Sequence, residues 1–133
     1  MSTLRSPNQA ELPRPGEVVS GKYRVDAVIG AGGMGVVMGA LDLSLGRPVA
    51  IKFLAPAKAR REGAVARFLR EARAAAAIQS EHVARVFEVG TTPAGAPFIV
   101  MEHLRGSDLA QIVAARGGLP VEEAVDYLLQ ACE

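Results

Sequence analysis

A glycine-rich run and an isolated lysine are the residues whose types and spacing could support chemistry. The run is Gly30-Ala31-Gly32-Gly33-Met34-Gly35, and its pattern Gly-x-Gly-x-x-Gly occurs in loops that bind phosphate groups through backbone amides. Glycine lets those amides approach an anion closely and tolerates positive φ. Lys52 lies in the otherwise apolar run Val49–Leu54, where a cation is costly unless it meets an anion. Together these residues predict a site for a phosphate-bearing ligand.

The glycine pattern alone does not identify the fold, because unrelated nucleotide-binding proteins share it. The dinucleotide-binding version needs a helix directly after the glycines and an acidic residue about 20 positions later. Here residues 36–41 read as a strand and the run 49–54 contains no acidic residue. A Walker-type phosphate loop is absent, since the Gly-Lys pair at 21–22 is followed by Tyr23. The remaining possibility is a glycine loop at the tip of a β-hairpin, and a Rossmann-type oxidoreductase would require a helix after Gly35.

The residues that follow the glycines carry a family resemblance. Val37 completes the pattern Gly-x-Gly-x-x-Gly-x-Val, and the run Val49-Ala50-Ile51-Lys52 places a lysine in the next apolar strand. This combination resembles the amino-terminal lobe of a protein kinase, and the flanking sequences resemble bacterial Ser/Thr kinases over about residues 22–133. The resemblance implies that Lys52 contacts the α and β phosphates of ATP and pairs with Glu71 on the following helix.

The same resemblance implies which residues bind the nucleotide. Ile29, Val37 and Ala50 would sandwich the adenine ring. The segment 98–104 resembles the last strand and the hinge of the lobe. The full set of expected binding residues is Ile29, Gly30, Ala31, Gly32, Gly33, Met34, Gly35, Val37, Ala50, Lys52, Met101 as gatekeeper, Glu102 through its carbonyl, Leu104 through its amide, and Asp108 near the ribose. Lys52 and Glu71 are the expected catalytic residues.

Two motifs of the family do not occur in these 133 residues. Kinases use a His-Arg-Asp loop for the base and one metal ligand, and an Asp-Phe-Gly motif for the main magnesium ligand. We therefore predict no metal site in this sequence, with Mg²⁺ held by residues outside it, and no activity of the chain alone. We expect a fragment of a longer kinase that transfers the γ-phosphate of ATP to Ser or Thr hydroxyls of protein substrates. The alternative is a noncatalytic kinase-like module that binds a nucleotide or a partner.

Several of these residues also have purely structural interpretations. Lys52 could extend its ammonium group to solvent along the strand, and Glu71 could pair with Arg67 four residues earlier on an exposed helix face. Asp108 could cap a helix. His82 and His103 have no partner constellation in the sequence, and we expect them to be structural or exposed.

The elements that must position the site give an α+β fold. The apolar pattern predicts five strands, near residues 23–29, 36–41, 49–54, 83–89 and 98–101, and one main helix over 64–78. The kinase resemblance implies that these strands form one antiparallel sheet on which the helix packs. Short helices are expected over 109–115, with Ser107 as a possible N-cap, and from 120 onward. The predicted organisation is a flexible leader (1–20), an amino-terminal lobe with its hinge (21–104) and the start of a carboxyl-terminal lobe (105–133).

Composition excludes several classes of protein. Half of the residues are hydrophobic and 22% are charged, which permits a packed core. The net charge of +1 gives no general attraction to nucleic acid or to an anionic membrane. The sequence has no run of about 18 apolar residues that could span a bilayer. The single cysteine, Cys132, excludes an intrachain disulfide and favours a reducing, cytoplasmic location.

Overall fold

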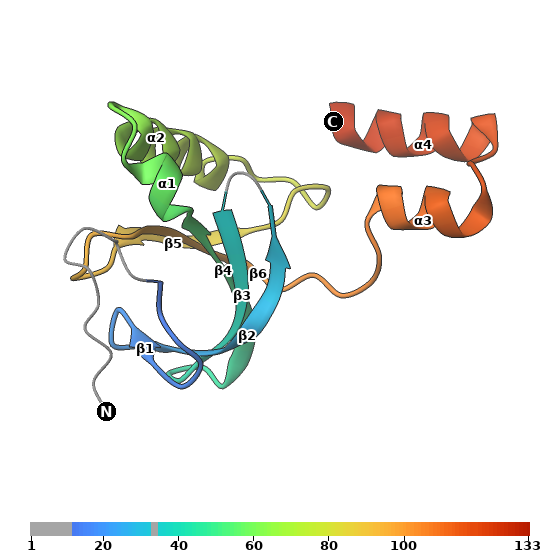
Figure 1. Ribbon diagram of the computed structural model, residues 1–133. Helices are drawn as coiled ribbons and strands as arrows, with labels where there is room; N and C mark the ends of the chain where they lie inside the picture. The colour runs from blue at the N-terminus through green and yellow to red at the C-terminus, as the bar shows by residue number, and fades with distance from the viewer. Residues whose placement is uncertain (1–11, 33–34) are drawn as a thin grey trace.

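The computed structural model describes residues 12–32 and 35–133, which form one curled antiparallel sheet and four helices (Figure 1). The strand order is β1-β2-β3-β4-β6-β5, and each neighbouring pair is antiparallel. The strands are β1 (Val18–Val19), β2 (Tyr23–Ala31), β3 (Gly35–Asp42), β4 (Arg47–Leu54), β5 (Val86–Thr91) and β6 (Pro97–Glu102). The helices are α1 (Pro56–Ala59), α2 (Ala64–Ala76), α3 (Leu109–Arg116) and α4 (Val121–Cys132). Because β3 follows the glycine run directly, the Rossmann alternative is excluded.

The α+β class is as predicted, but the sheet has six strands rather than five. The additional strand, β1, pairs with the start of β2 and lies inside the stretch expected to be a flexible leader. Val19 in this strand is buried. Two residues are too few to produce a detectable alternation, so the sequence pattern did not reveal the strand. The helix α1 was also not predicted, and it begins at Pro56, directly after β4.

The hydrophobic core lies on one face of the sheet. Alternate residues of β3, β4 and β6 point to this face, and they are joined by residues from β1, β2 and the segment before β6. The buried cluster consists of Val19, Tyr23, Val25, Met38, Ala40, Val49, Ile51, Phe53, Ala96, Phe98 and Val100. The rings of Phe53 and Phe98 lie with their centroids 6.2 Å apart at an angle of 50°, an arrangement favourable for aromatic pairs.

A polar cluster joins the two ends of the sheet. Glu88 lies on β5, at the edge opposite β1, and its carboxylate accepts hydrogen bonds from the Tyr23 hydroxyl at 2.7 Å and the Ser20 hydroxyl at 3.2 Å. The Lys22 ammonium lies 3.6 Å from the same carboxylate. Burial, together with the bond to Glu88, raises the pKa of Tyr23 above its ordinary value. These contacts hold the curl of the sheet that Figure 1 shows.

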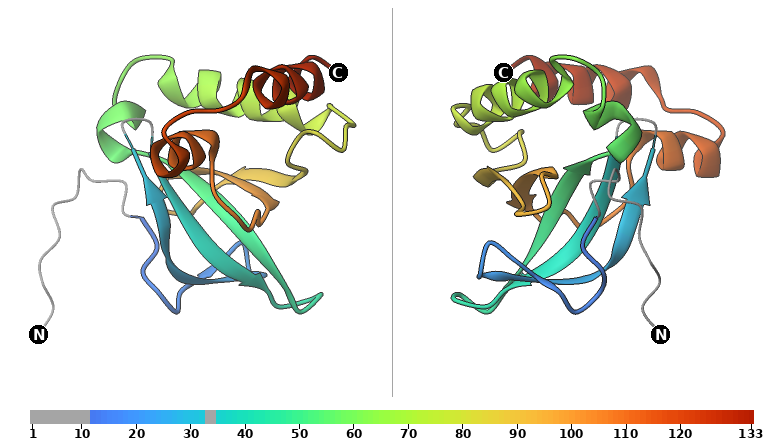
Figure 2. Two further views of the ribbon diagram at one scale, coloured as in Figure 1. Left: turned by 90° about the vertical axis from the view of Figure 1, so that its right-hand side faces the viewer. Right: turned by 60° about the vertical axis from the view of Figure 1, so that its left-hand side comes forward.

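The helices occupy two regions. The helix α2 packs against β5 and β6, whereas α3 and α4 form an antiparallel pair beyond the segment that follows β6 (Figures 1 and 2). Arg116 at the end of α3 forms a bidentate ion pair with Glu123 of α4, at 2.7 and 2.9 Å. Neither α3 nor α4 contains a buried residue. Among the described residues, no helix is long and apolar enough to cross a membrane.

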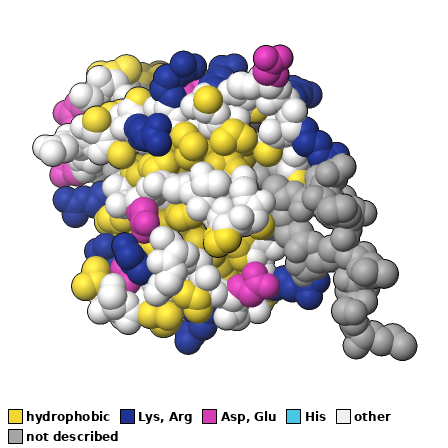
Figure 3. All heavy atoms as spheres, turned by 90° about the vertical axis from the view of Figure 1, so that its left-hand side faces the viewer, with side chains coloured by type: hydrophobic (Ala, Val, Ile, Leu, Met, Phe, Trp, Pro, Cys, Tyr) yellow, Lys and Arg dark blue, Asp and Glu magenta, His cyan; other side chains and the backbone are white. Residues whose placement is uncertain are grey.

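Hydrophobic side chains are also exposed on the face of the molecule that lies away from α3 and α4 (Figure 3). Figure 3 views the molecule from the left-hand side of Figure 1, and hydrophobic groups there lie between Lys, Arg and acidic side chains.

Candidate functional site

The antiparallel register brings four expected binding residues to one face of the sheet. Val37 is opposite Lys52, and two residues further along Ala50 is opposite Met101. Opposed residues point to the same face, as do residues two apart on one strand. Val37, Ala50, Lys52 and Met101 therefore share a face. The residues between them on the same strands point to the other face, where the core lies.

The residues in the middle of this face are small, so few side-chain atoms project from the sheet there. Ala50 is 5% exposed, and its neighbour across the ladder is Gly39, which the sequence analysis did not single out. A Cβ on Gly39 would lie 3.4 Å from the Ile29 Cγ2 and 4.0 Å from the His103 Nε2. Ile29 thus extends over the same face from β2, and it remains 52% exposed. A flat apolar group could lie on Ala50 with Ile29 and Val37 beside it.

The glycine run closes the hairpin at the end of this face. Gly30 is opposite Val37, and the Gly32 amide donates a hydrogen bond to the Gly35 carbonyl at 3.0 Å. Gly33 and Met34 lie outside the described residues. Gly30, Gly32 and Gly35 do not have positive φ, so positive φ, which we expected to be part of the reason for glycine, does not apply to these three. The three glycines differ instead in how much room each position leaves for a side chain.

A side chain could be added at two of these glycines and not at the third. A Cβ on Gly30 would meet only the Val37 Cβ, at 3.9 Å, and a Cβ on Gly32 would meet nothing within 4 Å. A Cβ on Gly35 would clash with the backbone carbonyl oxygen of Phe53. The fold therefore requires glycine at 35, but it gives no reason for glycine at 30 or 32. Close approach of a ligand to the backbone would give one.

The expected hinge follows β6. The Glu102 amide donates to the Arg85 carbonyl at 2.8 Å, and the Arg85 amide donates to the Glu102 side chain at 3.2 Å. Leu104 is 66% exposed. Within residues 12–32 and 35–133, its amide donates no hydrogen bond. This N–H group is available to an acceptor on a ligand.

Asp108 forms the N-cap of α3. Its carboxylate accepts from the Gln111 amide at 2.7 Å, and the Gln111 side chain accepts from the Asp108 amide at 2.9 Å. This capping box corresponds to the structural interpretation of Asp108, while its contact with a ribose stays a prediction. Of the two possible caps that the sequence offered, Ser107 and Asp108, the structure uses Asp108.

Lys52 and Glu71 are not paired in this structure. The Glu71 carboxylate instead accepts from the Arg67 Nε at 3.1 Å, with the two side chains 63% and 73% exposed. Lys52 is half-buried, and it forms no ion pair in the part of the chain that the structure describes. Among the described residues no anion pairs with the Lys52 ammonium, so this group could pair with a ligand phosphate.

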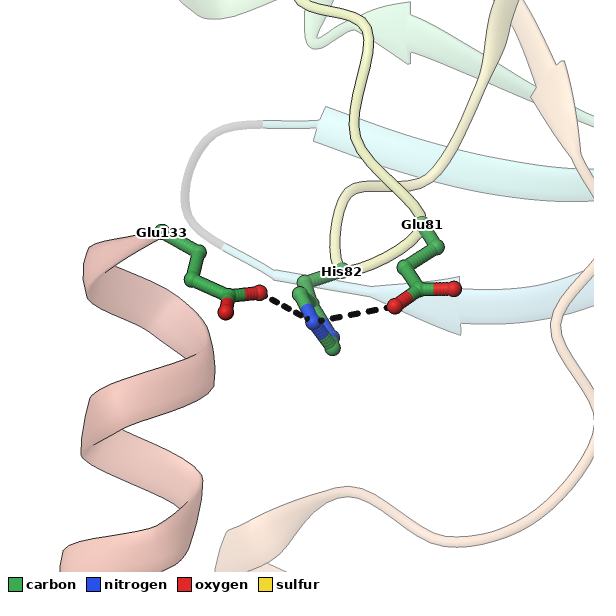
Figure 4. Close-up of side chains that lie close together, drawn as sticks. All are labelled: Glu81, His82 and Glu133. Carbon is green, nitrogen blue, oxygen red and sulfur yellow. Dashed lines mark ion pairs between the residues drawn. The ribbon is translucent and has the colours of Figure 1, made fainter.

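The structure also groups residues that the sequence did not connect. The His82 Nε2 lies 2.6 Å from a Glu133 carboxylate oxygen and 3.5 Å from one of Glu81 (Figure 4). This cluster joins the end of α4 to the loop between α2 and β5. All three residues are exposed, and contacts between the His82 ring nitrogen and the two carboxylates account for the cluster, so we assign no metal to it. Adjacent Glu and His in the sequence gave too weak a signal to predict it.

A cavity of about 840 Å³ lies between that loop, the start of β4 and the hinge. The Arg47 guanidinium stacks on the Phe87 ring there at 4.1 Å. The Arg47 Nε and the His103 Nδ1 are buried without a hydrogen-bond partner. Among the expected binding residues only Glu102 lines this cavity, so it is separate from the face that carries Lys52.

Comparison with known proteins decides the family. The family model described as protein kinase domain matches residues 23–133. The chain belongs to the protein kinase family. Serine/threonine-protein kinase pkn3 of Myxococcus xanthus is 41% identical over 111 residues, which are 84% of this chain and 20% of that protein. Serine/threonine-protein kinase PknB of Mycobacterium tuberculosis is 38% identical over 118 residues, 86% of this chain and 19% of that protein.

Solved structures support the same family. The PknI kinase domain of M. tuberculosis superimposes with a TM-score of 0.73 at 29% identity, covering 84% of this kinase chain and 45% of the solved chain. The similarity to bacterial Ser/Thr kinases and the kinase-like fold predicted from the sequence are thus confirmed. This kinase chain spans about a fifth of the length of the curated relatives, and it corresponds to the amino-terminal part of the kinase domain.

Proposed function

We propose that this chain is the ATP-binding part of a Ser/Thr protein kinase that transfers the ATP γ-phosphate to Ser and Thr hydroxyls of proteins. The main support is the register that places Val37, Ala50, Lys52 and Met101 on the face opposite the core. Within this proposal, adenine lies on Ala50 between Ile29 and Val37, and the hinge supplies an acceptor at the Glu102 carbonyl and a donor at the Leu104 amide.

The phosphates have a matching set of groups. Gly30 and Gly32 leave room for an anion against the backbone, and Lys52 supplies an ammonium group that has no ion pair within residues 12–32 and 35–133. Binding of the phosphates would give this cation an anionic partner. Glu71 would orient Lys52 by pairing with it. When bound with ATP, Mg²⁺ would neutralise phosphate charge, and we propose that its ligands come from residues outside this sequence.

The test is nucleotide affinity measured by calorimetry on this chain. Lys52→Met should raise the Kd for ATP about tenfold or more, because it removes a charge-assisted contact with the phosphates, while the melting temperature changes little. Lys58→Met on α1 is the matched control, and it should leave the Kd unchanged. Absence of ATP binding by the unaltered chain, or equal affinity of the Lys52→Met variant, would contradict the proposal.

An assay of phosphate transfer distinguishes the proposed kinase from the alternative, a noncatalytic kinase-like module. The relevant protein is the full product of the gene that encodes this chain, assayed with labelled ATP and a general protein substrate. Transfer that disappears in the Lys52→Met variant supports the kinase. ATP binding without transfer would favour the noncatalytic module.

A further inference from the structure

Glu71 lies at the border between the packed and the exposed side of α2. Ala72 is buried against the sheet, and Phe68 and Ala75 are half-buried. At about 100° per residue, Glu71 is next to Phe68 and Ala75 on this border, and Arg67 is one step further toward solvent. A carboxylate in this position can turn toward the sheet or along the helix surface.

Two cations are available to that single carboxylate. Arg67 holds it in this structure, at 3.1 Å on the exposed surface. Lys52, the partner that the proposed function requires, has no ion pair among the described residues. Since Arg67 is one helical turn away on the same helix, it is within reach of Glu71 whenever α2 is folded.

We propose that Arg67 is a positioning residue that competes with Lys52 for the Glu71 carboxylate and thereby opposes assembly of the ATP site. The proposal rests on the proposed function, because it assigns a regulator to the same Lys52–Glu71 pair. An exposed pair four residues apart on a helix shifts an equilibrium only about twofold. Arg67 is therefore a weak brake that bound ATP can release.

Chemical crosslinking tests the competition without nucleotide. A zero-length carbodiimide joins a lysine amine to a carboxylate only where the two groups touch, and the sequence has just three lysines, at 22, 52 and 58. Mass spectrometry should find about twice as much Lys52–Glu71 crosslink in Arg67→Gln as in the unaltered chain. Arg70→Gln removes the same charge from the same helix and should have no effect.

Affinity provides a second readout that a merely structural role of Arg67 would not reproduce. Arg67→Gln should tighten ATP binding about twofold and leave adenosine binding unchanged, because Lys52 contacts only phosphates in the proposed site. The gain should vanish when Glu71→Gln is also present. Equal crosslink yields in Arg67→Gln and the unaltered chain, or a gain shared by adenosine or by Arg70→Gln, would overturn the proposal. Failure of the unaltered chain to bind ATP would instead contradict the proposed function, and the crosslinking result would still judge the competition.

Discussion

The glycines of the run 30–35 that the structure describes occupy positions with different physical demands. Gly35 has no room for a side chain because the Phe53 carbonyl of the neighbouring strand lies against it. Gly30 and Gly32 have room and ordinary backbone conformations. A glycine that the fold does not require costs backbone entropy, so its presence is better explained by what binds there.

Alanine substitutions should separate these two roles. Gly32→Ala should change the free energy of unfolding by no more than about 1 kcal/mol, with either sign, but weaken ATP binding by crowding the phosphates. Gly35→Ala should reduce stability by about 1–3 kcal/mol, since strands must move apart. Chemical denaturation and calorimetric ATP titration of both variants give the comparison. A Gly32→Ala chain that binds ATP normally would remove the ligand explanation.

Asp42 controls the turn between β3 and β4. Its carboxylate accepts from the Ser44 hydroxyl at 2.6 Å and from the amides of Ser44 and Leu45 at 2.9 and 3.2 Å. The bond from the Ser44 hydroxyl is the main cause that lowers the pKa of Asp42, with further help from these amides and Arg47. The turn thereby sets the register that places Lys52.

This lowered pKa predicts an acid-dependent stability. A carboxylate whose pKa is lower in the folded state stabilises the fold fully above its ordinary value of about 3.9, and this contribution is lost as the pH falls through the lower folded value. The stability difference between the unaltered chain and Asp42→Asn should be constant above about pH 5 and shrink at lower pH. Denaturation measured from pH 7 to pH 2 checks this, and a difference independent of pH would be inconsistent with it.

At the scale of elements, the curl of the sheet depends on contacts between its edges. Tyr23 at the start of β2 and Glu88 on β5 are 65 residues apart in sequence, and their hydrogen bond brings opposite sides of the sheet together. Tyr23→Phe keeps the ring in the core and removes the hydroxyl. We expect a loss of about 1.5–3 kcal/mol, the range for hydrogen bonds to charged groups, measurable by urea denaturation.

The same pair predicts a change at alkaline pH. Because the pKa of Tyr23 is raised in the folded state, its contribution is complete below the ordinary value of about 10 and is lost as the pH rises toward the folded value. The stability advantage over Tyr23→Phe should therefore decline above about pH 10. Lys22→Met serves as a control that leaves the hydroxyl bond in place and should retain this decline. An advantage that persists undiminished at high pH would contradict the assignment.

At the scale of the whole molecule, stability is unevenly distributed. Ile51 in the core is fully buried, whereas Leu109 and Leu128 on α3 and α4 are 48% and 65% exposed. These two leucines therefore lack cover within the described residues. Helices without a buried face depend on weak local interactions, such as the Arg116–Glu123 pair.

We therefore expect α3 and α4 to open independently of the sheet. Hydrogen exchange should be much faster in 109–132 than in β3, β4 and β6. Leu128→Ala should cost less than about 0.5 kcal/mol, against about 2–5 kcal/mol for Ile51→Ala. Mass-resolved exchange and urea denaturation measure the two effects. Equal protection of the helices and the sheet would show that the molecule unfolds as a single unit.

Local pattern was sufficient to predict the family and most strands, and it named the residues of a candidate site, whose roles stay predictions. The glycine run, the lysine in an apolar strand and the hinge-like segment are short-range features, so their residues could be named directly. The sequence left two candidates for the helix cap, since Ser107 and Asp108 are both good caps, and only the backbone geometry showed that Asp108 is the cap. The strand β1 was missed because two residues gain their order from pairing with β2.

The sequence by itself determined the family and named the candidate site residues, because residue type and spacing along a strand or loop are local properties. Only the tertiary structure decided which of them meet. It placed Val37, Ala50, Lys52 and Met101 on one face through the register of neighbouring strands. It also showed that Glu71 pairs with Arg67 rather than with Lys52. The sequence pattern could not reveal this choice, because the partner of Glu71 depends on the orientation of the helix and the energies of the competing ion pairs differ little.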